Sequence, residues 1–155
     1  MMSQVLPSLY RFWQIWPFDL HHFFFYHKAT VSLYESGSKR KELVFNAVGT
    51  NQESWFSVGK LTSSSWPNIK TEPQNHFSIK GHCNDVGNCR SFIINRHYDT
   101  CDRDAGWLMW GGMLCSWENT PSNKNGFLYS KVSTYTEWSN SGKPFIHLAW
   151  PVVLN

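Results

Sequence analysis

The chain contains few charged residues. Asp, Glu, Lys and Arg make up 16% of its 155 residues, whereas a typical soluble domain has about 25%. Its net charge of +3 is too small to indicate nucleic-acid binding by itself. The 17% content of aromatic residues excludes a long disordered protein, because disorder requires few aromatic residues and a high net charge. The composition and length therefore predict one folded domain.

The chain also lacks an uninterrupted apolar run that could cross a membrane as a helix. Its most apolar stretch, Val5 to Tyr26, contains two prolines and several polar residues, and its flanks do not have the pattern of a signal peptide. The aromatic residues there follow neither a strand period nor a helix period. We predict that residues 1–27 are an aromatic segment outside the fold and that residues 28–155 form a single β-rich domain. The alternative is an amphipathic helix from Ser8 to Trp16 that docks on the sheet.

Recognisable catalytic motifs are missing. The sequence has no G-x-S-x-G nucleophile elbow, no P-loop and no H-E-x-x-H zinc motif. Carboxylates between Asp99 and Glu118 could supply an acid pair for polysaccharide hydrolysis, but that chemistry needs a set separation that a sequence does not fix. We expect a protein without catalysis, and a polysaccharide-acting hydrolase is the alternative.

Short segments typical of β-strands fill the chain from Thr30 onward. They are rich in β-branched and aromatic residues and are separated by Gly, Asn, Ser and Pro, and no sustained helical stripe interrupts them. The pattern predicts an all-β fold, an antiparallel sandwich or jelly-roll-like domain with long loops. Trp55 to Leu61 is predicted to be a strand, and Thr62 to Asn75 a long loop.

The four cysteines, Cys83, Cys89, Cys101 and Cys115, lie in one part of the chain. In a secreted protein they indicate two disulfides, with three possible pairings. We predict Cys83–Cys89 and, because Gly111-Gly112 can turn the chain back, Cys101–Cys115; Cys89–Cys101 is the main alternative. A zinc site is disfavoured because the C-x2-C spacing is absent. Unpaired buried cysteines of an intracellular protein are a further interpretation.

Polar and aromatic residues suggest a ligand surface. Nine tryptophans exceed what one small core needs, so we expect Trp55, Trp66 and Trp138, which lie beside polar loops, to be partly exposed. Exposed aromatic faces beside polar groups suit sugar or protein recognition. We predict a binding surface where the Thr62–Asn75 loop, the Asp99–Asp104 loop and the segment after Glu118 meet. Its predicted ligand-binding residues are Trp66, Asp99, Asp102, Arg103, Asp104, Asn119 and Asn123.

Each of these residues also has a plainer interpretation. Trp66 could pack beneath its own loop, and the acidic residues could simply solvate a turn. The three carboxylates between Asp99 and Asp104 could hold calcium, but the EF-hand pattern is incomplete, so we expect no cofactor and keep calcium as the alternative. The basic run Lys39-Arg40-Lys41 could contact phosphate, but it is more typical of a solvated hairpin tip.

Several short motifs resemble a cysteine-bearing, β-rich module of secreted invertebrate proteins, over residues 51–138. The segments before Lys41 and after Gly142 depart from that module. The resemblance implies an extracellular, disulfide-bearing binding or structural matrix module without a catalytic role. The expected partner is thus a glycan or an extracellular protein, with no nucleic acid and no membrane span. The motifs are Trp55-Phe56-Ser57, Ser63-Ser64-Ser65-Trp66, Phe77 to Gly81, Cys89 to Asn95, Tyr98, Cys101, Asp104, Gly106-Trp107-Leu108, Cys115 to Glu118, Phe127 to Ser130 and Trp138.

Overall fold

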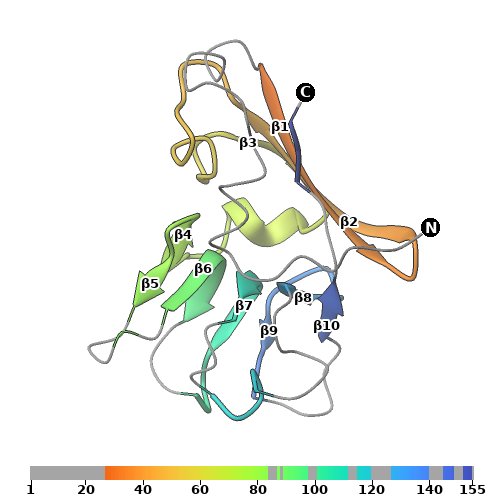
Figure 1. The fold of residues 1–155 in the computed structure, drawn as a ribbon, viewed down its shortest axis with the longest axis vertical. Coiled ribbons are helices and arrows are strands. Elements are labelled where there is room, and N and C mark those ends of the chain that lie inside the picture. Colours follow the sequence, from red (N-terminus) through yellow and green to blue (C-terminus); the bar gives the residue numbers. More distant parts are fainter. Residues whose placement is uncertain are drawn as a thin grey trace, which may run out of the picture.

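The structure is a computed structural model, shown in Figure 1. It describes residues 27–83, 87, 89–97, 101–111, 115–119, 127–139, 145–148 and 152–154, the last two ranges by their backbone only. Residues 1–26 of the predicted aromatic segment lie outside the described residues, so the predicted placement of that segment stays a prediction.

The smaller of two antiparallel sheets has the strand order β11-β1-β2-β3. The hairpin between β1 and β2 turns through Ser36 and Gly37, which both have positive φ angles of 51° and 78°. Two consecutive positive φ angles suit the right-handed twist of the strands that such a turn joins. The strands are β1 (Lys28–Glu35), β2 (Ser38–Asn46), β3 (Leu61–Ser64) and β11 (Val152–Leu154).

The larger sheet has the order β10-β8-β7-β6-β4, with β5 also paired to β6 and β9 to β7. A short 3-10 helix, η2 (Pro67–Lys70), lies between the sheets in Figure 1, and the described residues contain no α-helix. The predicted all-β class is therefore confirmed. The strands are β4 (His76–Ser78), β5 (His82–Cys83), β6 (Cys89–His97), β7 (Ala105–Trp110), β8 (Phe127–Ser130), β9 (Thr136–Glu137) and β10 (Phe145–Leu148).

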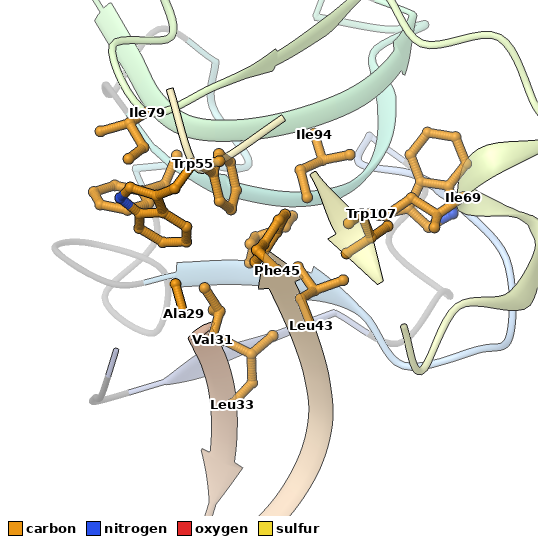
Figure 2. Close-up of a cluster of buried hydrophobic side chains, with 14 of the residues drawn as sticks. Ala29, Val31, Leu33, Leu43, Phe45, Trp55, Ile69, Ile79, Ile94 and Trp107 are labelled. Carbon is orange, nitrogen blue, oxygen red and sulfur yellow. The ribbon is translucent and has the colours of Figure 1, made fainter. Parts of the chain in front are cut away.

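The main core lies between the two sheets. Alternate residues of β1 and β2 are buried, as expected where one face of a sheet is covered. Val31 and Phe45 from the smaller sheet belong to the same buried cluster as Ile94, Leu108 and Tyr129 from the larger one. Figure 2 shows side chains from both sheets converging around Phe45. The two sheets thus form a sandwich, held by apolar burial between their inner faces.

Aromatic rings connect the sheets. Phe45 contacts Trp55 and Phe56 with ring centroids 5.3 Å apart, and Phe56 reaches Phe92 of β6 at 5.7 Å. Trp55 and Phe56 are adjacent in sequence, yet both are buried. A strand would send adjacent side chains to opposite faces. The prediction that Trp55 to Leu61 is a strand is accordingly wrong, because residues 55–60 form turns that bury both rings.

A second, smaller core covers the outer face of the larger sheet. Its buried members, Ile93, Met109 and Leu128, come from three neighbouring strands. Trp138 packs on them, and Trp117, which is partly buried, covers the cluster. This second core holds the loops at one end of the larger sheet in position.

Candidate recognition surface

Two disulfides stabilise the loops of the larger sheet. Cys83 of β5 pairs with Cys89 of β6, with Cα atoms 4.0 Å apart. Cys101 pairs with Cys115 at 5.4 Å and joins the loop before β7 to the segment at residues 115–119. Both pairings agree with the prediction, and the described part of the chain contains no free cysteine.

The loop at residues 101–104 is fixed on several sides. Trp117 donates its Nε1–H to the carbonyl of Cys101 at 3.0 Å. The hydroxyl of Ser139 donates to the carbonyl of Asp102 at 2.7 Å. The amide of Trp138 donates to the carbonyl of Asp104 at 2.9 Å. The loop is thus held in place through its backbone carbonyls.

Three of the predicted binding residues lie at this end of the sheet. Asp102 and Arg103 are exposed on the fixed loop, and Asn119 is exposed in a turn closed by its own amide and the carbonyl of Ser116 at 3.2 Å. The Cys101–Cys115 disulfide joins the two segments. The disulfide therefore links the loop at residues 101–104 to the segment that carries Asn119. We call Asp102, Arg103 and Asn119 the polar end.

The predicted role of the first segment needs correction. Trp66 has no exposed surface, and its Nε1–H donates to the carbonyl of Ser130 at 2.9 Å. Lys41 covers its ring, with Nζ 5.5 Å from the ring centroid. Trp55 and Trp138 are buried as well. The expectation that these three tryptophans are exposed is wrong, because each indole fills space between elements that are distant in the sequence.

Asp104 lies in an ion cluster beneath the polar end. Its side chain is 3% exposed and accepts a hydrogen bond of 2.6 Å from Nη1 of Arg90. Nε of the same arginine donates to Glu118 at 2.8 Å, and Nη2 lies 3.2 Å from the sulfur of Cys115. The Arg90 guanidinium also lies 5.0 Å from the ring centroid of Trp117. We call Arg90, Asp104 and Glu118 the buried triad.

The two carboxylates of the triad keep Arg90 charged. Burial alone would lower the pKa of Arg90, but the hydrogen bonds and charges of Glu118 and Asp104 outweigh it and raise that pKa. The guanidinium is therefore a permanent cation. Asp104 and Glu118 are both buried against it, so neither can reach a polysaccharide chain. The geometry gives the hydrolase alternative no support at these two residues.

Sequence reasoning missed Arg90. Its partners lie 14 and 28 residues away, and no short-range charge pattern links such distant positions. The only local indication is that Arg90 stands shortly before a run of apolar strand residues. An arginine on a covered sheet face needs a buried partner. Asp99 and Asn123 lie outside the described residues.

A metal site finds no support in the described part of the chain. No group of three or more His, Cys, Asp or Glu side chains there is arranged to hold an ion. His76 and His82 stack with ring centroids 4.8 Å apart, which places ring face against ring face instead of aiming two nitrogens at one point.

No protein-family model matches the chain, and no curated protein or solved structure is significantly similar to it. The resemblance to a module of secreted invertebrate proteins therefore stays a prediction. Within the described residues, no helix has the length and apolar character needed to cross a membrane.

Proposed function

We propose that the chain is a disulfide-stabilised extracellular recognition module that binds a glycan or a protein ligand without catalysis, through its polar end. The observation that carries the proposal is that Asp102, Arg103 and Asn119 are exposed on two segments joined by the Cys101–Cys115 disulfide. A guanidinium, a carboxylate and an amide together supply donors and acceptors for hydroxyl or peptide groups.

The rigidity of the polar end supports this role. A backbone hydrogen bond from Trp138, side-chain hydrogen bonds from Ser139 and Trp117, and the triad hold the loop from below. A surface that is already ordered loses less conformational entropy when it binds, so more of the contact energy appears as affinity. Loops on a rigid β-scaffold are common positions for binding residues.

The two disulfides support an extracellular location. Disulfides persist in oxidising compartments and are rare in cytosolic proteins, where thiols are kept reduced. The resemblance to a secreted module implies the same location. The proposed ligand is a polar molecule, because the polar end presents a carboxylate, a guanidinium and an amide.

A structural matrix module is the second candidate. The burial of four tryptophans favours it, because a buried indole packs in the core and offers no binding surface. These tryptophans are Trp55, Trp66, Trp107 and Trp138. Trp110 and Trp117 are only partly exposed. On this alternative the polar end would have no ligand of its own.

A glycan and extracellular-matrix protein array, probed with the folded protein, tests the proposal. The variants Arg103→Ala and Asn119→Ala should each lose about tenfold or more of the affinity for any ligand found. Because both side chains are exposed, both variants should keep the melting temperature of the wild type.

Lys70→Ala is the matched control, because Lys70 is exposed on η2 and belongs to no part of the polar end. It should bind like the wild type. A ligand whose affinity is unchanged in both polar-end variants would overturn the proposed surface. Absence of any ligand on the array would favour the structural alternative.

A further inference from the structure

The end of the β1–β2 hairpin concentrates positive charge. Lys39, Arg40 and Lys41 lie on β2, and Lys131 follows β8 beside them. The carboxylates among them are Glu35 and Glu42. Four cations and two carboxylates give this surface a local net charge of +2. We call the four cationic side chains the basic hairpin surface.

A β-bulge changes the direction of one of the three consecutive basic residues. Leu33 pairs with Lys41, but the next residue, Tyr34, pairs with Lys39, so Arg40 is the extra residue. In a regular strand, neighbours point to opposite faces, whereas a bulge redirects one of them. Arg40 consequently reaches Glu35, while Lys41 points toward the larger sheet.

The cations are held in place before any ligand arrives. Glu35 forms ion pairs with Nε of Arg40 at 3.2 Å and with Nζ of Lys131 at 3.3 Å. Lys41 donates to the carbonyl of Val132 at 2.9 Å. These contacts connect the hairpin to the end of β8 in the other sheet. Since the side chains are already positioned, an anion would lose little binding energy to ordering them.

Positive charge remains available at this surface. Arg40 and Lys39 keep about half of their side-chain surface exposed, at 51% and 49%. Nε of Arg40 contacts Glu35, and a guanidinium can bind an oxyanion as a planar fork. The ring under Lys41, that of Trp66, is buried and offers no face for stacking a nucleic-acid base.

We propose that the basic hairpin surface binds sulfated glycans. The surplus of positive charge, the prearranged cations and the two extracellular-type disulfides favour a polyanion of the cell surface or matrix. The buried ring of Trp66 gives a nucleic-acid base no stacking partner beneath Lys41. This inference rests on the proposed recognition role but uses none of the residues of the polar end.

Heparin affinity chromatography and binding isotherms at several salt concentrations test the inference. The wild type should bind heparin, and its affinity should fall steeply with salt, since released counterions drive such binding. The double variant Arg40→Gln/Lys131→Gln should weaken binding about tenfold or more. Its melting temperature should change little, because exposed ion pairs contribute little stability.

The matched control is Lys70→Gln/Lys80→Gln, which removes the same amount of charge from exposed positions elsewhere. It should weaken heparin binding less than about threefold. Arg40→Lys keeps the charge but loses the planar fork, so it should fall between the wild type and the double variant. Chemically desulfated heparin should bind at least tenfold more weakly than heparin.

Three outcomes would overturn the inference. They are failure to bind heparin, equal losses in the two double variants, and tighter binding of single-stranded DNA than of heparin. The polar-end variants Arg103→Ala and Asn119→Ala separate this inference from the proposed function. Heparin binding that survives them but not Arg40→Gln/Lys131→Gln supports the hairpin alone, and the reverse result supports only the polar end.

Discussion

Arg90 and Asp104 form an ion pair of 2.6 Å in which both side chains are almost fully withdrawn from solvent. Arg90 makes a second pair with Glu118 at 2.8 Å, also buried. Such pairs add little net stability over an apolar replacement of both partners, but removal of one partner leaves the other charge buried without compensation. Replacement of one member of the triad should therefore lower the free energy of unfolding by a readily measured amount.

Replacement of Arg90 by Met should destabilise the fold by about 3–5 kcal/mol, because two buried carboxylates lose their shared cation. Denaturant unfolding at neutral pH measures the loss. Arg40→Gln is the control, since the Arg40–Glu35 pair is partly exposed and its loss should cost less than about 1 kcal/mol. Equal losses for the two variants would contradict the importance given to the triad.

Removal of the Cys101–Cys115 disulfide as a Ser/Ser double variant should cost about 3 kcal/mol, the amount expected for closing a loop of roughly 15 residues. The sulfur of Cys115 also lies against Arg90, so the variant should loosen the triad. The Cys83–Cys89 disulfide closes a shorter loop, so its removal as a Ser/Ser double variant should cost less stability. Chemical unfolding of both variants compares them, and a larger loss from the shorter loop would be inconsistent with this ranking.

Tyr129→Phe should stabilise the protein. Tyr129 is fully buried, and its hydroxyl has no hydrogen-bond partner among the described residues. Burial of that hydroxyl, assisted by the charge of Glu35, raises the pKa of Tyr129. An unsatisfied buried polar group costs about 1–3 kcal/mol, so its removal should increase the free energy of unfolding by about 1 kcal/mol. A measured decrease would show that the hydroxyl has a stabilising partner.

Gly81→Ala should be severely destabilising. Gly81 has a φ of 75°, and a Cβ atom there would overlap the backbone carbonyl oxygen of Arg90. Neither the strain nor the overlap can be relieved by a side-chain rotation, so a loss of more than about 2 kcal/mol is expected. Gly37→Ala is the control: it has a similar φ of 78° but open space around it, so it isolates the cost of the backbone conformation.

Stability should fall on acidification because of His76. Burial, and then the charge of His82, lowers the pKa of His76 below its ordinary value of 6.5. The unfolded chain therefore binds a proton more readily than the folded one, so the contribution is complete above pH 6.5 and is lost as pH falls toward the lower folded-state pKa.

The melting temperature of the wild type should accordingly drop more between pH 7.5 and pH 5 than that of His76→Gln. His97→Gln, at an exposed position, serves as the control and should follow the wild type. Identical pH profiles for the wild type and His76→Gln would rule out this role for His76.

Much of the fold follows from local patterns. The period-2 alternation of Val31, Leu33, Leu43 and Phe45 is present in the sequence and puts these residues on the covered face of the smaller sheet. The pairing of Cys101 with Cys115 was also predictable, because the Gly111-Gly112 dipeptide lies between them and allows the chain to turn back. These features depend on neighbours along the chain.

The candidate site depended much less on local patterns. Asp102, Arg103 and Asn119 were predicted as surface residues because acidic and amide residues favour loops, and the disulfide brought their segments together. Trp66 and Asp104 were assigned to the same surface and lie instead in the interior. A residue with polar neighbours in the sequence can still be buried, because an element that is distant in the sequence can cover it.

The sequence by itself determined the all-β class and most of the strands, and it favoured the disulfide pairing that the structure has, because hydrophobic periodicity and loop closure act over short stretches of chain. Only the tertiary structure decided which tryptophans are buried and which carboxylates share Arg90. Those outcomes depend on contacts such as Trp66 with Ser130 and Arg90 with Glu118, which join residues 64 and 28 positions apart. The free energy of such contacts comes from desolvation and charge pairing that exist only after the sheets have packed.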